Sequence, residues 1–164
     1  MEKLWAPWRI KYIKTKKKSK CLFCAPDNSK EKKYVIFKTK HSICMLNAFP
    51  YNNGHLMVSP SRHTRELSQL TDAELLDLFK ALSQAKNLLD KILKPQGYNI
   101  GINTSGTAGA GITGHMHIHI VPRWNGDTNF MPVIFDTKII SQSLDELFKQ
   151  LKHVKSNTDK RIRR

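Results

Sequence analysis

The chain lacks the signals of a membrane or secreted protein. It has no run of 18 apolar residues, the minimum for a transmembrane helix. Its start, MEKLWAPWRIKYIK, has neither the apolar segment nor the small-residue cleavage site of a signal peptide. We therefore predict a cytoplasmic protein with no membrane partner.

Cysteine is scarce, with only Cys21, Cys24 and Cys44 among 164 residues. An odd count without a secretion signal argues against a disulfide scaffold. The Cys-x-x-Cys spacing of the first two suits a metal site or a redox pair. The redox reading is the weaker one because the β-α-β setting of thioredoxin-like proteins is absent. Cys44 stands between apolar residues and is expected in the core.

Acidic residues are few. The chain has 13 Asp and Glu against 28 Lys and Arg, which gives a net charge of +15. Such a charge attracts polyanions, including nucleic acids, nucleotides and anionic membrane surfaces. Much of it lies in residues 14–20 and 155–164, where no aromatic residue is interleaved as in single-stranded nucleic-acid sites. We interpret both segments as solvated and mobile, so nucleic acid is an alternative partner that the sequence does not favour.

The chain is long enough for one domain with a core. We predict a single domain over residues 1–154 and a disordered basic tail over 155–164. Two helices are predicted, one over 71–94 and one near 143–153. Short apolar runs predict five strands, at 34–38, 42–47, 54–60, 98–103 and 115–121. Because no β-α alternation repeats, the order indicates an α+β fold with a mainly antiparallel five-stranded sheet, one long helix and a C-terminal helix.

Both predicted helices carry start signals. Thr71 with Glu74, and Ser143 with Glu146, each match the capping box that closes the first helical turn. Pro95 marks the end of the long helix. The apolar stripe of the long helix, at spacings of three and four, consists of Leu75, Leu78, Phe79, Leu82, Ala85, Leu89 and Ile92.

A glycine-rich segment, TSGTAGAGITG, occupies residues 104–114 and follows the fourth predicted strand. Glycine lets a loop bring backbone N–H groups close to a ligand. The segment lacks the Gly-Lys-Ser/Thr ending of a Walker loop. We therefore expect a loop beside a ligand, of a different kind from the P-loop.

The segment GHMHIHIVPRW (114–124) places three histidines at alternate positions. In a strand, His115, His117 and His119 share one face, and successive side chains on that face are attached about 7 Å apart. The intervening Met116, Ile118 and Ile120 face the other way and are expected to pack in the core under the long helix.

Three interpretations fit the histidine face. It can be the polar side of an ordinary strand, or a catalytic metal site in which His-x-His supplies two ligands. It can also supply a histidine nucleophile, because neutral imidazole near pH 7 attacks phosphorus and forms a covalent intermediate. The spacing is too wide for one phosphorus atom to contact all three rings, and it suits separate roles along an extended ligand.

GHMHIHIVPRW resembles the signature of the histidine triad family, in which three histidines alternate with apolar residues. NAFPYNNGHLMVSPSRH (47–63) resembles the family's upstream block, and CLFC (21–24) its N-terminal element. The resemblance covers about residues 5 to 135. WAPWRIKYI (5–13) and PRWNGDTNFMPV (122–133) are similar to the bacterial branch related to diadenosine tetraphosphate phosphorylases.

The resemblance implies a histidine triad fold, a homodimer and an enzyme that acts on adenine nucleotides and dinucleoside polyphosphates. It implies that His117 attacks the α-phosphorus and forms a nucleotidyl-histidine intermediate. His119 would then contact phosphate or the bridging oxygen and help the leaving group depart. Phosphate as the acceptor gives ADP, and the enzyme is then a phosphorylase; water gives AMP, and it is then a hydrolase of dinucleoside polyphosphates or phosphoramidates. A nucleotide- or nucleic-acid-binding protein with little turnover is the remaining alternative.

Further site residues follow from the same resemblance. Asn47 matches a position that hydrogen-bonds ribose, although Asn is also a common turn former after a strand. His55 is expected to support the triad from a neighbouring strand. The residues expected around the base and phosphates are Leu22, Phe23, Asn103, Gly111 and Thr113. Many relatives have a polar side chain where this chain has Gly111, so the backbone or Thr113 takes that role only weakly.

The resemblance also implies a metal site. Zinc-containing relatives use a Cys-x-x-Cys pair, the histidine that ends the upstream block and the first triad histidine. Those positions are filled here by Cys21, Cys24, His63 and His115. Four such ligands form a closed, structural tetrahedral zinc site without an open position for catalysis. No organic cofactor is expected. Arg123 is expected either to pair with distal phosphates or to form an ion pair with Asp127.

Overall fold

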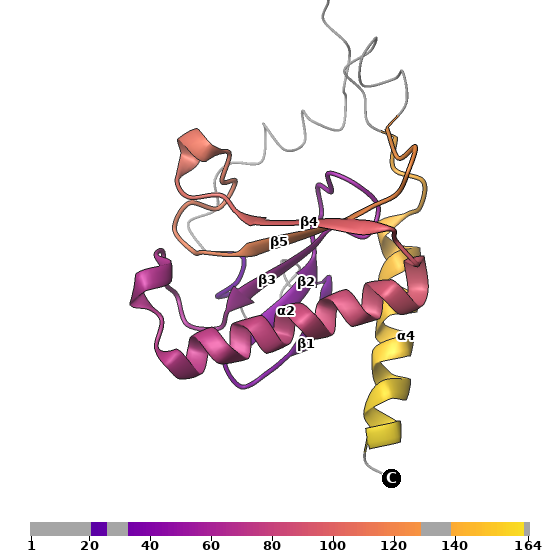
Figure 1. The fold of residues 1–164 in the computed structure, drawn as a ribbon. Helices are drawn as coiled ribbons and strands as arrows, with labels where there is room; N and C mark the ends of the chain where they lie inside the picture. Colours follow the sequence, from indigo (N-terminus) through magenta and orange to yellow (C-terminus); the bar gives the residue numbers. More distant parts are fainter. Residues whose placement is uncertain (1–20, 26–32, 129–138, 163–164) are drawn as a thin grey trace, which may run out of the picture.

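The computed structural model describes residues 21–25, 33–128 and 139–162. One antiparallel sheet has the strand order β1-β2-β3-β5-β4 (Figure 1). Its strands are β1 (Val35–Lys38), β2 (Ser42–Leu46), β3 (Leu56–Pro60), β4 (Gly97–Ile102) and β5 (Ile118–Arg123). The helices are α2 (Asp72–Leu93) and α4 (Leu144–Ile162), with short 3-10 turns η2 (Leu67–Gln69) and η3 (Gly106–Ala108). The predicted α+β fold with a five-stranded antiparallel sheet is confirmed.

The helices cover one face of the sheet (Figure 1). The core between them joins residues from four strands and both helices, among them Cys44, Val58, Leu78, Ile120 and Leu151, all fully buried. Met116, Ile118 and Ile120 belong to this core, as the alternation of the histidine segment predicts. The opposite face carries a smaller apolar cluster of Phe23, Ile43, Met45 and Met57.

The long helix begins as its sequence predicts. The Thr71 side chain accepts a hydrogen bond from the Glu74 N–H, and the Glu74 side chain accepts one from the Thr71 N–H. The helix ends with Lys94 in the left-handed conformation at φ 46°, directly before Pro95. One member of the predicted apolar stripe is wrong, because Phe79 is 58% exposed and points away from the sheet.

Helix α4 is longer than the predicted helix at 143–153. It runs to Ile162, past the predicted end at 153, and so extends into the basic segment 155–164. The Ser143 Oγ accepts a hydrogen bond from the Glu146 N–H at the start of the helix. Leu147 and Leu151 are buried against the core. No glycine or proline follows Leu144 to stop the helix, so the hydrogen-bonded turns continue through the basic residues.

Strand β5 begins later than predicted. It spans Ile118–Arg123, so His119 lies within it while His115 and His117 precede it. At this end the last pairs of β5 join Ile118 to Val58 of β3 and to Ile102, the final residue of β4. Beyond that point the backbone N–H of Met116 donates to the carbonyl of Thr64, at 2.8 Å, rather than to a sheet partner. The described residues include no helix long and apolar enough to cross a membrane.

Candidate functional site

Two cysteines and two histidines converge at one end of the histidine segment. The Cys21 Sγ lies 3.3 Å from the His115 Nδ1, and the Cys24 Sγ lies 3.2 Å from the His63 Nδ1 and 3.5 Å from the His115 Nδ1. All four ligand atoms lie within 4.8 Å of one another. In tetrahedral zinc sites, sulfur and nitrogen ligands stand about 3.5 Å apart. The four side chains that the sequence predicts as ligands therefore form a cluster that fits a tetrahedral metal.

The fully buried His115 is oriented for this cluster by its second ring nitrogen. Its Nε2 lies 2.9 Å from the carbonyl oxygen of Pro60, and it donates to this acceptor. The proton is thereby placed on Nε2, and the Nδ1 lone pair points at the cysteine sulfurs. A backbone carbonyl on the far nitrogen is the usual support of a metal-binding histidine.

His117 is held in the opposite way. Its Nδ1 lies 3.0 Å from the carbonyl oxygen of His115 and donates to it. The Nε2 therefore carries the lone pair. Burial lowers the pKa of His117, and the hydrogen bond to the carbonyl of His115 opposes this shift only in part. The ring is thus a neutral base with its nucleophilic nitrogen fixed in direction.

His119 is paired with His55 across strands β5 and β3. The His55 Nε2 lies 2.8 Å from the His119 Nδ1. The His55 Nδ1 faces two N–H donors, the backbone of Tyr51 at 3.1 Å and the side chain of Asn47 at 3.3 Å. His55 must therefore accept at Nδ1 and donate at Nε2. This makes His119 an acceptor at Nδ1 and leaves its proton on Nε2.

Burial keeps this pair neutral. It is the main cause that lowers the pKa of His55 to about 3 and that of His119 to about 4, and the neighbouring histidines add to both shifts. The rings of His117 and His119 meet edge to face with centroids 4.7 Å apart, closer than the strand spacing suggests. The ring that carries a lone pair at Nε2 and the ring that carries an N–H at Nε2 are therefore in contact.

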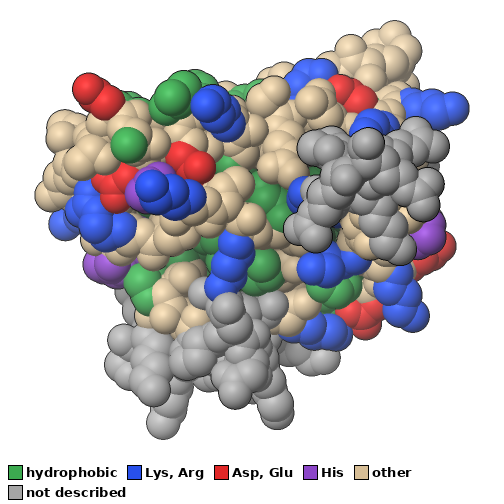
Figure 2. Space-filling view, turned by 90° about the horizontal axis from the view of Figure 1, so that it is seen from below, with side chains coloured by type: hydrophobic (Ala, Val, Ile, Leu, Met, Phe, Trp, Pro, Cys, Tyr) green, Lys and Arg blue, Asp and Glu red, His purple; other side chains and the backbone are tan. Residues whose placement is uncertain are grey.

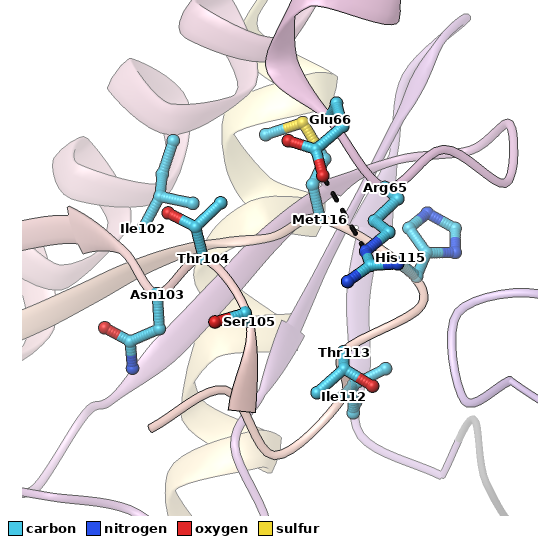
Figure 3. Close-up of a pocket in the computed structure, with 10 residues that line it drawn as sticks. All are labelled: Arg65, Glu66, Ile102, Asn103, Thr104, Ser105, Ile112, Thr113, His115 and Met116. Atoms are coloured by element: carbon cyan, nitrogen blue, oxygen red, sulfur yellow. Dashed lines mark ion pairs between the residues drawn. The ribbon is translucent and has the colours of Figure 1, made fainter. Parts of the chain in front are cut away.

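The glycine-rich loop borders a small hollow near the cluster. Figure 3 shows Asn103 and Ser105 from the start of the loop and Thr113 from its end, with Arg65 and His115 on the other side. Ser105 has φ 69° and Gly109 φ 88°, so the loop turns through left-handed conformations. Asn103 and Thr113, two of the predicted nucleotide-binding residues, both line this hollow, whereas Gly111 does not.

The predicted base and ribose contacts have structural roles as well. Phe23 is 2% exposed, with ring centroids 5.0 Å from His115 and 5.3 Å from His117. Leu22 is half-buried against the apolar cluster of Phe23, Ile43, Met45 and Met57. The Asn47 Oδ1 accepts from the backbone N–H of Phe49, which is the turn-forming role that the sequence left open. These contacts shape one wall of the site.

Two residues near the site were missed from the sequence. Tyr51 packs on His55 and His119, with ring centroids at 4.5 and 5.6 Å, and Arg65 lines the hollow beside the glycine-rich loop. Tyr51 stands four residues before His55 in the block that resembles the family, which was the available signal.

Arg123 pairs with Asp127 through two hydrogen bonds of 2.6 and 2.9 Å, so the ion-pair alternative holds for it.

Comparisons with known proteins agree with this geometry. Over 154 residues the chain is 34% identical to the AP-4-A phosphorylase of Mycobacterium tuberculosis, covering 88% of this chain and 79% of that protein. Over 93 residues it is 36% identical to the asymmetrical bis(5'-nucleosyl)-tetraphosphatase of Schizosaccharomyces pombe, covering 57% of this chain and 50% of that protein. A zinc-bound histidine triad protein from Mycobacterium smegmatis has a similar fold, with a TM-score of 0.61 at 23% identity over 77% of this chain and 86% of that one.

The family model of the HIT domain matches residues 28–126. This range includes the upstream block, the glycine-rich loop and all three alternating histidines. Together with a relative 34% identical over most of both chains, it shows that the chain belongs to the HIT family, the histidine triad proteins.

Proposed function

We propose that the protein is an enzyme that processes dinucleoside polyphosphates such as diadenosine tetraphosphate through a nucleotidyl-histidine intermediate. The observation that carries the proposal is the opposite polarity of two adjacent rings. His117 presents a lone pair at Nε2, while His119 presents an N–H at Nε2. A nucleophile beside a proton donor is what displacement at phosphorus needs.

In the first step, the His117 Nε2 attacks the α-phosphorus and forms a P–N bond. The bond from that phosphorus to the bridging oxygen breaks, and the oxygen takes the electron pair. The His119 Nε2–H donates a hydrogen bond to this oxygen and stabilises its negative charge, and ATP leaves when the substrate is diadenosine tetraphosphate. The carbonyl of His115 stabilises the positive charge that develops on the ring of His117.

In the second step, an acceptor oxygen attacks the nucleotidyl group and His117 leaves as neutral imidazole. We infer that Asn103, Thr113 and backbone N–H groups of the glycine-rich loop donate to the non-bridging oxygens as charge builds. Their position in one hollow with His115 supports this role. The family resemblance gives Asn47 a ribose contact and Leu22 and Phe23 a base contact. Each of these side chains can contact the nucleotide only through its solvent-exposed part.

We propose that zinc occupies the cluster of Cys21, Cys24, His63 and His115. The donor set, the ligand spacing and the carbonyl behind His115 all fit this metal. Zinc supplies structural crosslinking there, because four protein ligands leave no position for a reactant. Its anchoring effect reaches the nucleophile, since His115 lends its side chain to the cluster and its carbonyl to His117.

We favour phosphate as the acceptor, which makes the protein a phosphorylase. The similarity to the AP-4-A phosphorylase, over most of both chains, supports this choice. The shorter similarity to the asymmetrical tetraphosphatase supports hydrolysis as the alternative. A phosphoramidate hydrolase is a further alternative with the same first step.

The test is to incubate the protein with diadenosine tetraphosphate, with and without inorganic phosphate, and to identify the products by anion-exchange chromatography. Phosphorolysis gives ADP and ATP, and only when phosphate is present. Hydrolysis gives AMP and ATP in both mixtures. Absence of turnover with any nucleotide would contradict the enzyme proposal.

Nucleic acid remains the less favoured partner. On the face shown in Figure 2, Lys and Arg side chains are spread around the surface with acidic side chains between them, rather than gathered in one patch. A nucleic-acid partner predicts binding that weakens steeply with salt and negligible turnover of small nucleotides. The cytoplasmic location also stays a prediction.

We further propose a homodimer. Leu76 and Phe79 on α2 are each 58% exposed, and Ile100 and Ile102 on β4 are 48% and 38% exposed. Strand β4 is the last strand of the sheet, and pairing with a second copy would continue the ladder. The molar mass measured by light scattering tests this, and Phe79→Glu is expected to shift the population toward monomers. A wild-type monomer at micromolar concentration would contradict it.

A further inference from the structure

Tyr51 is an exposed aromatic residue in direct contact with the catalytic pair. It lies in the loop between β2 and β3, and 53% of it is exposed. Its ring centroid lies 4.5 Å from that of His55 and 5.6 Å from that of His119. Single exposed apolar side chains are common on protein surfaces. This one differs because it stands at the edge of the site, packed on catalytic machinery while much of it faces solvent.

The loop holds Tyr51 in a fixed position. Its backbone N–H donates to the His55 Nδ1 at 3.1 Å. The next residue, Asn52, is buried and donates to the carbonyl of Pro122 at 3.0 Å. Gly54 closes the loop with φ 78°, where an added Cβ would come within 2.5 Å of Leu93. A ligand that binds the ring therefore meets a surface that is already ordered, which reduces the entropic cost of binding.

The two ends of the histidine row carry different aromatic residues. Phe23 contacts His115 and His117 but is only 2% exposed, so it has little surface left for a ligand. Tyr51 contacts His55 and His119 and keeps half of its surface open. In the proposed reaction, the His119 Nε2–H donates a hydrogen bond to the bridging oxygen. The departing part of the substrate is therefore on the side of His119, where Tyr51 stands.

We propose that Tyr51 is the stacking platform for the base of the leaving nucleoside. The inference rests on the proposed function and adds a specificity to it. A substrate that carries a nucleoside at each end of its polyphosphate gains a contact that a substrate with one nucleoside cannot make. Stacking of a base on an aromatic side chain is tolerant of base identity, because every base has a π-face. Tyr51 thus selects for the second nucleoside and not for a particular base.

The test compares two substrates that differ only in the second nucleoside, diadenosine tetraphosphate and adenosine 5'-tetraphosphate. Tyr51→Ala is expected to lower kcat/KM for the first by about tenfold to a hundredfold and to leave the second unchanged. Tyr51→Trp is expected to retain or raise the preference. Tyr51→Leu, which keeps apolar bulk without a π-face, is expected to behave like Tyr51→Ala.

Leu67→Ala serves as the matched control, because Leu67 is an apolar residue 47% exposed on η2, outside the proposed site. It is expected to change neither rate. Equal losses on both substrates with Tyr51→Ala would show that Tyr51 only supports His119 and would overturn the proposal. An unchanged preference would overturn it as well.

Failure of the proposed function is distinguishable, because the wild-type protein would then turn over neither substrate. In that case calorimetric titration still decides the inference. Tyr51→Ala is expected to weaken binding of diadenosine tetraphosphate by the same factor and to leave AMP binding unchanged. Equal affinities of the wild-type and variant proteins for diadenosine tetraphosphate would remove Tyr51 as a platform.

Discussion

At one end of the histidine row, His115 and His63 turn their Nδ1 atoms toward two cysteine sulfurs. At the other end, His55 and His119 face each other through a single hydrogen bond of 2.8 Å. The difference lies in what each ring's second nitrogen contacts. The carbonyl of Pro60 frees the Nδ1 of His115 for a metal, whereas two N–H donors make His55 a donor to His119. Side chains of one type thus differ in which ring nitrogen is free and which carries the proton, according to the groups beside them.

The two ends are joined by His117, which lies between them. Its Nδ1 hydrogen-bonds the carbonyl of His115, and its ring packs at 4.7 Å on His119. A change at either end therefore reaches the nucleophile, but by a different route. The cluster end acts on the direction of the His117 ring, and the His55 end acts on the N–H of His119 that stabilises the leaving group.

The largest effect is expected from removing the residue that joins the ends. His117→Ala should lower nucleotide release on the order of 10⁴-fold or more, because the covalent intermediate cannot form. Nucleotide binding should be largely spared. Mass spectrometry of the protein quenched under alkaline conditions should detect an added nucleotidyl group in the wild type and none in the variant. Retained turnover would remove His117 as the nucleophile.

The second-largest effect is expected from removing a ligand of the cysteine–histidine cluster. Cys21→Ser should abolish stoichiometric zinc, which we expect at one per chain, and should lower the free energy of unfolding on the order of 3 kcal/mol. Activity should fall as well, because His115 loses its anchor. Metal analysis and thermal unfolding measure both effects. Cys44→Ala is the matched control, since Cys44 lies in the core, and it should retain the metal. A wild-type protein purified without metal would defeat the four-ligand proposal.

Breaking the other end should leave the metal in place. His55→Ala removes the donor that fixes the proton of His119 on Nε2, and kcat for diadenosine tetraphosphate should fall on the order of 10²-fold. The loss should shrink with an AMP ester whose leaving oxygen spreads its charge into an aromatic ring and needs less hydrogen-bond stabilisation, such as a p-nitrophenyl ester. Zinc content is measured alongside and should match the wild type. Equal losses on both substrates would argue for a structural role of His55.

The smallest expected effect concerns pH. In the unfolded chain, histidines take up protons near 6.5, whereas the folded protein protonates His119 only near pH 4 and His55 only near pH 3. Between these values the unfolded state binds more protons, so the free energy of unfolding falls as the pH falls from 6.5 to 4. Urea unfolding across this range measures the slope. The slope should persist in Cys21→Ser, where metal release makes no contribution, and should flatten in His55→Phe.

Much of the fold could be predicted from local patterns. The capping box at Thr71, the helical stripe of α2 and the alternation of Met116, Ile118 and Ile120 each specify their structure within a few residues. Phe79 was misplaced because periodicity marks an apolar stripe but does not tell how wide a face the sheet covers. The length of α4 was underestimated because charge was taken as disorder where no helix-breaking residue occurs.

By itself the sequence singled out the residues to which we assign the proposed chemistry. The spacings of three features suggested these roles, with support from the family resemblance. The features are the Cys-x-x-Cys pair, the upstream histidine and the alternating histidines. Only the tertiary structure decided how each histidine is oriented and which nitrogen bears its proton. Those assignments depend on the carbonyls of Pro60 and His115 and on the N–H of Tyr51. Every residue carries such backbone groups, so they leave no mark in the sequence, and they act only where folding brings them beside an imidazole.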